Sequence, residues 1–537
     1  MCGIIGVFPG SPINLDCLNH RGPDSLGIYE DSRFVFGHTR LAINDLSKHG
    51  YQPAVSEEGN IILVFNGEIY NHRALVKSEY KSDTKSLVNW IEKSGLSNID
   101  LTEIDGMYAF GAYDIVRDEW LIARDVSGIK PLYITISKDR KRFAFASEIK
   151  AFYTLDWFHA EPNMSYSDQC EILQFGYNLP RIERISFCGH TVALNLTPTM
   201  LSDVYQFCAG QTLLFNQIAG FQLNEFKFDR SDQNSVEVLL GMAVKSQSIA
   251  DVEIGVQLSG GCDSSLIAYK YAEHCPRLQG FYASVCAPDR CEDEFAYHAA
   301  KVLKGVTDFQ LHRIEVTQAE ISRILKKVVW HMDEPLMRHP NAFGIYLICE
   351  YVKKNTAIKV LLTGEGADET FGGYSWHDGC SVGSKFLRSR EIFKNSLSNH
   401  SRIDEAWTKF KGKTTLESQL NFDQYVYMQP IMNRQDKMSM ANSIEARVPF
   451  LSRNFMKNKY PTSPGKGGIK LAVEARFGKD FANRSKMGFG IPWDWLADIA
   501  PVGKHACNWI LPKISVKTAQ QQWAKLALCL WEEQYLR

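Results

Sequence analysis

A cysteine at position 2 is the first residue of the chain whose type and place suggest chemistry. Removal of the initiator methionine would leave Cys2 at the amino terminus. Its own α-amino group, with a pKa of about 8, could then act as general base for the thiol, with no histidine partner. The alternative is that Cys2 is one of 13 cysteines packed as small apolar side chains. The other motifs of the chain must decide between the two.

The segment LSGGCDSS (258–265) has the composition of an anion-binding turn between a predicted strand and a predicted helix. Its two glycines let the backbone approach an anion, its serines add hydroxyl donors, and Asp263 can hold Mg²⁺ against phosphate oxygens. The alternative is an ordinary glycine turn capped by serines. The pattern resembles the pyrophosphate-binding loop of the ATP pyrophosphatases and lacks the lysine of a P-loop. It therefore predicts a site that holds pyrophosphate rather than a transferable γ-phosphoryl group.

A second segment, LLTGEGADETFGGY (361–374), follows another predicted strand. It places Glu365, Asp368 and Glu369 among four glycines, and such carboxylates suit a metal–phosphate site where the ion offsets their repulsion. A solvated acidic turn is the plain alternative. Because both segments follow strands of one predicted parallel sheet, they should meet at the carboxyl ends of those strands, where such sheets bind ligands.

The third segment, RSKMGFGIP (484–492), follows RQDKMSMANSIEARVPFL (434–451). Lys486 can supply the cation for a leaving pyrophosphate, which the first loop does not provide. Surface charge with core packing is the alternative for both segments, and the second is interpreted mainly as packing.

The elements that position these residues differ between the two halves of the chain. Short apolar, β-branched or aromatic runs between about 34 and 148, separated by turn residues, predict antiparallel sheets packed face to face. A helix is predicted over 83–94, with Asp83 as its N-cap. From about 235, strands alternate with helices, which predicts a parallel sheet with helices on both faces. The domains are therefore predicted at 1–155 and 236–537, with a weakly patterned connector that carries small strands at 156–235.

The overall composition argues against a nucleic-acid-binding, secreted or membrane-spanning protein. The formal charge of −1 gives no field for nucleic acid or anionic lipid, so no nucleic-acid partner is expected. The apolar run near the amino terminus is short and broken at Pro9, so neither a secretory leader nor a membrane span is expected. A cytoplasmic protein with free thiols follows as the expectation.

Seven further segments follow Cys2 in order: HRGPD (20–24), HTRLAIND (38–45), FNGEIYN (65–71), SDT (82–84), DGMYAFGAYD (105–114), ARDVSGIKPLY (123–133) and FASEIKA (145–151). With the two ATP-type loops, they resemble the glutamine-hydrolysing asparagine synthetase family from Cys2 to about Pro492. The resemblance implies an N-terminal Ntn-hydrolase glutaminase domain (a class II glutamine amidotransferase) of stacked antiparallel sheets. It also implies a C-terminal parallel-sheet α/β synthetase domain of the ATP-pyrophosphatase type.

The resemblance implies a role for each matching residue of the first domain. Cys2 would attack the carboxamide carbon of glutamine, and the Asn66 side chain and Gly67 N–H would form the oxyanion hole. Arg40 would grip the substrate α-carboxylate, with Glu68 and Asp83 at its α-amino group. The remaining members of the implied glutamine-binding segment are Leu41, Ile43 and Asn44.

In the second domain the resemblance implies ATP as co-substrate, with Mg²⁺ held by Asp263 and Asp368 and with Glu365 and Lys486 as catalytic residues. The implied ATP-binding residues are Leu258, Ser259, Gly260, Gly261, Asp263, Ser264, Thr363 and Gly364. The implied reaction activates aspartate as an acyl-adenylate and transfers ammonia from glutamine to it. The products would be asparagine, glutamate, AMP and pyrophosphate. A homodimer is compatible with this family.

Departures from the family pattern leave alternatives open. The form of RSKMGFGIP resembles that of relatives from surface-polysaccharide and natural-product biosynthesis, and the stretch His339-Pro340-Asn341 does not specify an aspartate pocket. The main alternative to aspartate is therefore an amidotransferase that acts on another carboxylate, such as a uronic-acid sugar. A ring-closing β-lactam enzyme would lack Cys2, and a tRNA-thiolating enzyme would need no glutaminase. A catalytically inactive binding protein is the alternative from another class. The intact set Cys2, Asn66, Asp263, Glu365 and Lys486 argues against it.

Overall fold

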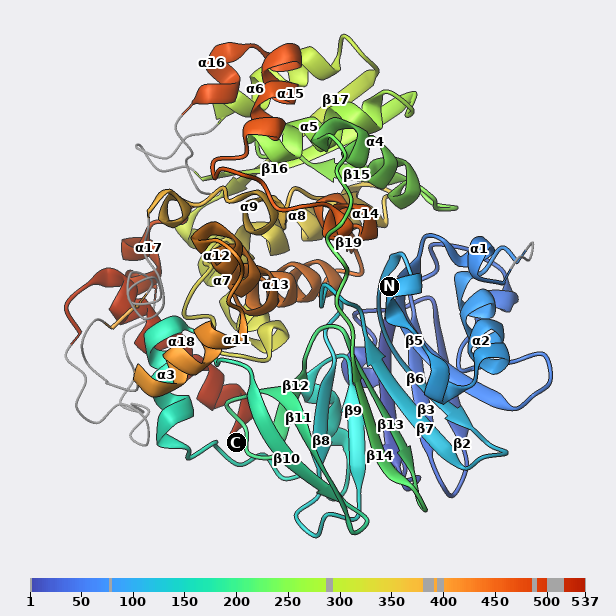
Figure 1. The fold of residues 1–537 in the computed structure, drawn as a ribbon. Helices are drawn as coiled ribbons and strands as arrows, with labels where there is room; N and C mark the ends of the chain where they lie inside the picture. The colour runs from blue at the N-terminus through green and yellow to red at the C-terminus, as the bar shows by residue number, and fades with distance from the viewer. Residues whose placement is uncertain are drawn as a thin grey trace. The chain divides into compact units, whose positions relative to one another are not determined.

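The computed structural model describes residues 2–76, 80–285, 293–379, 391–393, 400–484, 490–499 and 516–536. The chain forms two compact units, and each is described by itself (Figure 1). The amino-terminal unit comprises Met1–Asn163, Leu179–Asp229 and Ile249–Val252. The carboxy-terminal unit comprises Met164–Asn178, Arg230–Ser248 and Glu253–Arg537. No helix within these described ranges is long and apolar enough to span a membrane.

One sheet of the amino-terminal unit has eight strands in the order β10-β11-β12-β8-β9-β1-β3-β2, and the paired neighbours run antiparallel. Its central strand β1 carries Cys2 at its first position. The strands are β1 (Cys2–Phe8), β2 (Ser25–Glu30), β3 (Val35–Arg40), β8 (Tyr133–Ile136), β9 (Phe143–Ala146), β10 (Arg181–Phe187), β11 (His190–Pro198) and β12 (Val204–Phe207).

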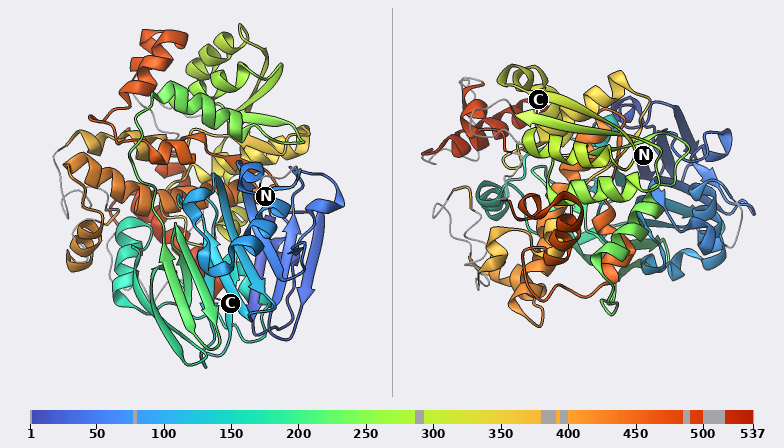
Figure 2. Two further views of the ribbon diagram at one scale, coloured as in Figure 1. Left: turned by 45° about the vertical axis from the view of Figure 1, so that its right-hand side comes forward. Right: turned by 90° about the horizontal axis from the view of Figure 1, so that it is seen from above.

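The other sheet has six strands in the order β14-β13-β7-β6-β5-β4, again antiparallel. The two sheets pack face to face (Figure 2). The buried core between them includes the stacked rings of Phe8 and Trp120, whose centroids are 4.6 Å apart. The strands are β4 (Ala54–Val55), β5 (Ile61–Ile69), β6 (Gly106–Asp114), β7 (Glu119–Arg124), β13 (Gln211–Asn216) and β14 (Gly220–Glu225).

Helix α2 (Asp83–Ser94) covers the outer face of the six-stranded sheet, where Leu87, Val88 and Ile91 join a second core. Its bounds confirm the predicted helix, but the predicted N-cap is wrong. Ser82 has the extended cap conformation, and its side chain accepts the N–H of Lys85. Asp83 lies one position inside the helix, and its carboxylate instead accepts the N–H groups of Ile69 and Thr84.

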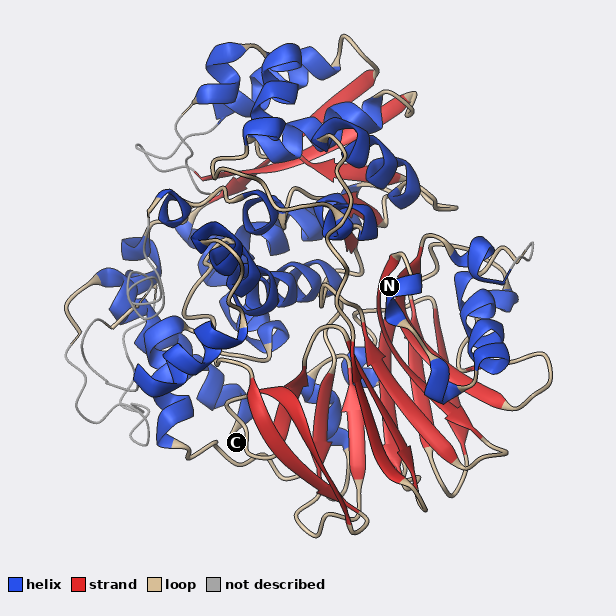
Figure 3. Cartoon of the chain, viewed as in Figure 1, coloured by secondary structure: helices blue, strands red, loops and turns tan. Residues whose placement is uncertain are grey.

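The carboxy-terminal unit has a parallel five-stranded sheet in the order β17-β16-β15-β18-β19, with helices around it (Figure 3). Together with the antiparallel sheets, it confirms the predicted fold class. The strands are β15 (Ile254–Gln257), β16 (Arg277–Val285), β17 (Asp308–Val316), β18 (Val360–Leu362) and β19 (Glu445–Arg447). The helices used below are α4 (Val236–Gln247), α5 (Cys262–Ala272), α6 (Asp293–Leu303), α8 (Ala342–Asn355), α9 (Ala367–Phe371), α13 (Met428–Met440) and α15 (Gly467–Phe477).

The middle of the chain contributes more regular structure than its weak pattern indicates. Strands β10 to β12 extend the eight-stranded sheet from β8, and β13 and β14 extend the six-stranded sheet from β7. Both sheets of the amino-terminal unit are therefore completed by residues 181–225, which follow helix α3 (Tyr166–Phe175) of the other unit.

Candidate active sites

The first candidate site is built at the start of β1. Cys2 is paired in register with Arg40 of β3 and is almost fully buried. Its backbone N–H donates to Asn66 Oδ1 at 3.1 Å, and Asn66 Nδ2 donates to Ser147 Oγ at 3.4 Å. The same serine oxygen accepts the N–H of Ile4 at 3.1 Å. Strands β1 and β5 and the end of β9 thus fix Asn66 beside the backbone nitrogen of Cys2.

A buried charged cluster that the sequence prediction missed supports Cys2 from the other side. The Arg21 Nε–H donates to the Cys2 carbonyl at 2.9 Å, and its Nη1 lies 2.7 Å from Glu148 Oε1. Lys150 and His20 also contact the Glu148 carboxylate. Burial alone would raise the pKa of Glu148, but Lys150, His20 and Arg21 hold it well below its usual range. The cluster therefore keeps a charged carboxylate that orients Arg21 toward Cys2.

A pocket opens beside Cys2 and brings together almost all of the predicted glutamine-binding residues. Of the predicted set, Cys2, Arg40, Leu41, Ile43, Asn44, Gly67, Glu68 and Asp83 line it. Asn66 is held against Cys2, as described above. The pocket is also lined by Gly50, Gln52, Phe65, Ser82 and Thr84. The SDT segment contains the last two, but no sequence signal singled out Gly50 or Gln52.

The loop after β3 fixes the Arg40 side chain in this pocket. Its Nη1 donates to the Ser47 carbonyl at 2.9 Å, its Nη2 donates to the Asp45 carbonyl, and its guanidinium lies over the Tyr51 ring. A Cβ on Gly50 would lie 2.0 Å from Arg40 Nη2, so a side chain at this position would displace the guanidinium. The loop itself is held by Asp251, whose N–H donates to the Ile43 carbonyl and whose carboxylate accepts the Asp45 N–H.

The charges of the pocket are complementary to a free α-amino acid. Arg40 supplies a cation for a carboxylate, while Glu68 and Asp83 supply carboxylates for an ammonium group. Asn44 Nδ2 donates to Glu68 Oε2, so this pair is already oriented. Burial raises the pKa of the Cys2 thiol, against the opposing effects of the Leu41 N–H and Arg40. The thiol therefore depends on a proton acceptor for activation.

Gly67 shows why β5 and β6 meet so closely at this site. A Cβ there would lie 2.1 Å from the Met107 carbonyl oxygen of β6. A side chain at Gly67 would push the strands apart beside the thiol, and the close approach keeps its N–H in a fixed place. This geometry agrees with the oxyanion role that the resemblance implies for Gly67. That role stays a prediction.

The second candidate site lies at the carboxyl ends of β15 and β18, which are neighbours in the parallel sheet. The loop after β15 is held by Ser259, whose Oγ lies 3.1 Å from Ser264 Oγ and accepts the Gly261 N–H at 3.2 Å. Gly260 has φ +76°, and a Cβ there would lie 2.6 Å from the Ala296 backbone nitrogen of α6. Glycine is therefore required at this turn.

The loop after β18 packs directly on the first turn of α5. A Cβ on Gly364 would lie 3.0 Å from the Ser264 backbone nitrogen and 3.1 Å from Asp263 Cβ. The buried Thr363 donates its N–H to the Arg447 carbonyl at 2.9 Å. Leu258 is also buried, and its N–H donates to Phe281 of β16. The predicted ATP-binding residues of both loops therefore lie together, as expected for adjacent strand ends.

Lys466 is the main residue of this site that the sequence prediction missed. Its Nζ lies 2.6 Å from Asp263 Oδ2 and 2.8 Å from Asp368 Oδ1, so one ammonium group bridges the two predicted metal ligands. Burial would lower the pKa of Lys466, but Asp263 and Asp368 raise it above its usual value. The side chain is therefore a permanent cation between the two loops.

The donor set fits a divalent cation. Asp263 and Asp368 converge on one cationic group, and both offer the carboxylate oxygens that Mg²⁺ prefers. Asp263 Oδ1 is buried and has no hydrogen-bond partner among the described residues. A Cβ on Gly373 would lie 1.9 Å from Asp368 Oδ1, so glycine keeps this space open. Whether these carboxylates hold a metal stays a proposal.

Glu365 begins the turn before α9 and pairs with a buried arginine of α13. Its Oε1 lies 2.5 Å from Arg434 Nη2, and Arg434 Nη1 donates to Asn341 Oδ1 at 3.1 Å. Arg484, the first residue of RSKMGFGIP, donates to the Gly260 carbonyl at 2.8 Å. That motif therefore begins at the nucleotide loop. The predicted Lys486 lies outside the described residues.

Comparison with known proteins shows relatives over most of the chain. A family model described as asparagine synthase matches residues 235–513, and one described as a glutamine amidotransferase domain matches residues 1–181. Asparagine synthetase (glutamine-hydrolyzing) 1 of Bacillus subtilis strain 168 is 27% identical over 92% of this chain and 87% of its own length. Asparagine synthetase B (glutamine-hydrolyzing) of Escherichia coli K12 is 26% identical over 94% and 84%. The asparagine synthetase (glutamine-hydrolyzing) of Rattus norvegicus is 27% identical over 85% and 76%.

Proposed function

Because the chain belongs to the asparagine synthase family, we propose that it is a glutamine-dependent asparagine synthetase. It hydrolyses glutamine in the amino-terminal unit and transfers the ammonia to an ATP-activated acid in the carboxy-terminal unit. The observation that carries the proposal is the pocket in which a buried thiol faces one arginine and two carboxylates. That arrangement is complementary to the α-carboxylate and α-ammonium groups of an amino acid.

The glutaminase step uses residues that the structure places around Cys2. Arg40 binds the α-carboxylate of glutamine, and Glu68 and Asp83 bind its α-ammonium group, which aims the carboxamide at the thiol. The nitrogen atom that Asn66 Oδ1 contacts becomes the free α-amine once Met1 is removed. That amine accepts the thiol proton, and the thiolate attacks the carboxamide carbon. Ammonia leaves, and water hydrolyses the thioester to glutamate.

The synthetase step uses the two loops of the parallel sheet. The Ser259–Ser264 loop holds the β- and γ-phosphates of ATP, and Lys466 offsets their charge as pyrophosphate leaves. Mg²⁺, when bound, would supply further charge neutralisation, and Asp263 and Asp368 would hold it. The acceptor carboxylate attacks the α-phosphorus to give an acyl-adenylate. Glu365, held by Arg434, is placed to take a proton from the ammonia that displaces AMP.

Aspartate is the proposed acceptor, and another carboxylic acid such as a uronic-acid sugar is the second candidate. Asn341 contacts Arg434, which contacts Glu365, so the segment after His339 reaches the reacting centre. Burial, with Arg434 and Arg338, holds the pKa of His339 well below its usual value, so its imidazole is neutral. The neutral imidazole and the Asn341 amide can hydrogen-bond to hydroxyl groups, whereas Arg434 can pair with a carboxylate, so both candidates fit this segment.

Pyrophosphate release with glutamine, ATP, Mg²⁺ and a panel of carboxylic acids tests the acceptor directly. We expect turnover with aspartate, and AMP rather than ADP as the nucleotide product. Turnover only with a uronic acid would replace aspartate by the second candidate. Formation of ADP would overturn the mechanism.

A variant at the thiol tests the division of labour between the two sites. Cys2→Ala should abolish glutamine-dependent turnover and leave ammonium-dependent turnover largely intact, because ammonia then reaches the acyl-adenylate from solution. Cys188→Ala, at a half-buried cysteine outside both sites, is the matched control. Equal loss of both activities in Cys2→Ala would show that the roles are misassigned.

A further inference from the structure

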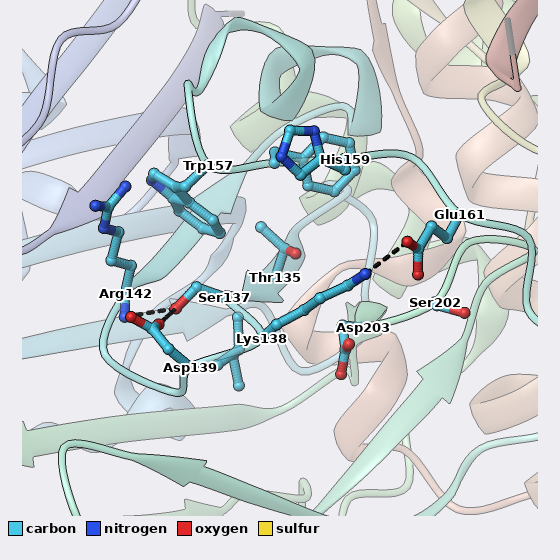
Figure 4. A pocket seen from close by; sticks show the side chains of 12 residues that line it. Thr135, Ser137, Lys138, Asp139, Arg142, Trp157, His159, Glu161, Ser202 and Asp203 are labelled. Atoms are coloured by element: carbon cyan, nitrogen blue, oxygen red, sulfur yellow. Dashed lines mark hydrogen bonds and ion pairs between the residues drawn. The ribbon is translucent and has the colours of Figure 1, made fainter.

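A second cavity lies in the amino-terminal unit beside the turn between β8 and β9 (Figure 4). Its volume is about 300 Å³. That is at the lower end of the range of roughly 300 to 1,000 Å³ for small-molecule sites. None of its lining residues lines the Cys2 pocket, and the proposed reaction uses none of them. The cavity is therefore a separate candidate site.

Part of the lining of this cavity is aromatic. Trp157 and Phe158 line it together with the buried Thr135 and Ile136 of β8. The Trp157 Nε1 atom is buried and has no hydrogen-bond partner within the described part of the chain. A buried indole N–H normally donates to an acceptor, and a bound molecule can supply one. The aromatic part of the lining thus suits an organic group that carries a polar atom.

The rest of the lining carries charges of both signs. Lys138 and Arg142 contribute cations, and Asp139, Glu161 and Asp203 contribute carboxylates. Three carboxylates would repel a nucleotide or another polyanion, because such a ligand places several negative charges against them. The lining is instead matched to a ligand of small net charge that carries both signs.

An ion pair reaches across the cavity and is the exchangeable part of this charge set. Lys138 Nζ lies 2.5 Å from Glu161 Oε1, and the two side chains are 67% and 50% exposed (Figure 4). Exposed pairs of this kind contribute little to stability, so a ligand can replace them at low cost. The other charges have partners outside this pair. Arg142 lies 3.4 Å from Asp156, Arg140 lies 2.9 Å from Asp203, and Asp139 accepts the Ser137 hydroxyl.

We propose that this cavity binds a free α-amino acid as its zwitterion. The ligand inserts between Lys138 and Glu161, with its α-carboxylate on the lysine and its α-ammonium on the glutamate. Lys138 and Glu161 then each pair with a charge of the ligand instead of with each other. The ligand side chain packs against the Trp157 ring. An amine or an acid alone pairs with only one of the two side chains, whereas a zwitterion pairs with both, and for this reason the site selects the zwitterion.

Calorimetric titration of the full-length protein tests the proposal. The probes are the standard amino acids other than glutamine, aspartate, glutamate and asparagine, which the proposed reaction itself uses or releases. We expect at least one of them to bind. Its α-carboxamide and its N-acetyl derivative should each bind about tenfold more weakly, because each lacks one charge of the zwitterion.

Two variants assign the binding to the cavity. Lys138→Met should weaken binding of the amino acid to the level of its carboxamide, and Glu161→Gln should weaken it to the level of the N-acetyl derivative. Both side chains are exposed, so both variants should fold. Lys141→Met, on the same turn but outside the lining, is the matched control and should bind like the parent protein.

Three results would overturn the proposal. The first is the absence of binding by any probe up to about 10 mM, near the weak limit of specific recognition. The second is equal affinity for an amino acid and its carboxamide. The third is binding that neither Lys138→Met nor Glu161→Gln changes, because the ligand would then occupy another site. Each result is independent of glutamine hydrolysis and pyrophosphate release.

Discussion

At the scale of single residues, Lys466 is a site residue that could not be predicted from the sequence alone. It lies in the turn PTSPGKGG (461–468), which has no pattern of its own, and 203 positions separate it from Asp263. The motifs around Asp263 and Asp368 could be recognised because glycines, serines and carboxylates are clustered there. A lone lysine in a turn carries no such signal, and only the fold places it between the two carboxylates.

Removal of the Lys466 ammonium should leave Asp263 and Asp368 without the cation that holds them together. Lys466→Met should lower the free energy of unfolding by up to about 3 kcal/mol, because Asp263 and Asp368 then face each other without a counter-charge. Mg²⁺ should restore part of that loss by taking the vacant position. Thermal unfolding with and without Mg²⁺ measures the effect.

The control for this experiment is Lys470→Met in helix α15, which begins directly after Lys466, because Lys470 contacts neither carboxylate in the described structure. Mg²⁺ should raise the melting temperature of Lys466→Met more than that of Lys470→Met or the parent. An equal shift in all three proteins would mean that the carboxylates do not form a metal site.

Glu148 should make the amino-terminal unit sensitive to acid. Its pKa is held below the ordinary value near 4.5, so the folded state binds this proton less readily than the unfolded state. The stabilisation is therefore complete above pH 4.5 and is lost as the pH falls toward the folded pKa. Glu148→Gln should unfold more easily at pH 7, by roughly 3 kcal/mol, because Arg21 and Lys150 lose their counter-charge.

Urea unfolding between pH 7 and pH 3 measures this dependence. Below pH 4.5 the free energy of unfolding should fall more steeply for the parent protein than for Glu148→Gln. Glu58→Gln, at an exposed position, is the control and should follow the parent. Parallel pH profiles for the parent and Glu148→Gln would contradict the expected role of this carboxylate.

At the scale of elements, the sequence predicts best where apolar and polar residues alternate or repeat with a clear period. The helix at 83–94 is amphipathic and was predicted with its observed bounds. Strand β1, by contrast, is buried at all seven positions and was not predicted, because a strand with two buried faces shows no alternation. Strands β10 to β14 lie in the weakly patterned connector. The local sequence could not predict that β12 pairs with β8 and β13 with β7, because these partners are distant in the chain.

The loop between β3 and β4 gives an element-scale prediction. Gly50→Ala would place a Cβ 2.0 Å from Arg40 Nη2 and force that side chain away from its two carbonyl acceptors. We expect the KM for glutamine to rise about tenfold with a smaller change in kcat, because substrate positioning is lost. Steady-state glutaminase kinetics measure both constants.

Gly241→Ala is the matched control. Gly241 lies inside α4, and a Cβ there meets nothing within 4 Å. This variant should keep the parent KM and gain about 0.5 to 1 kcal/mol of stability from better helix propensity. A normal KM in Gly50→Ala would show that the loop does not position Arg40 for the substrate.

At the scale of the whole molecule, the strand pairs predict which fragment folds. A fragment of residues 1–163 lacks β12 and β13, so β8 and β7 become unpaired edges. It should aggregate or unfold without cooperativity, whereas a fragment of residues 1–229 should unfold cooperatively. Circular dichroism during urea unfolding distinguishes the two. Cooperative unfolding of the shorter fragment would instead support a domain that ends near residue 155.

Strands β10 to β14 follow in the chain the strands with which they share a sheet, and this order matters during translation. Ribosomes add roughly 5 to 20 residues per second, so the 62 residues from 164 to 225 take about 3 to 12 seconds to translate. Until they emerge, the nascent chain carries two open sheet edges that no later residue has yet closed. A chaperone that binds extended polypeptide would have its best opportunity in that interval, before Cys2 is enclosed between two complete sheets.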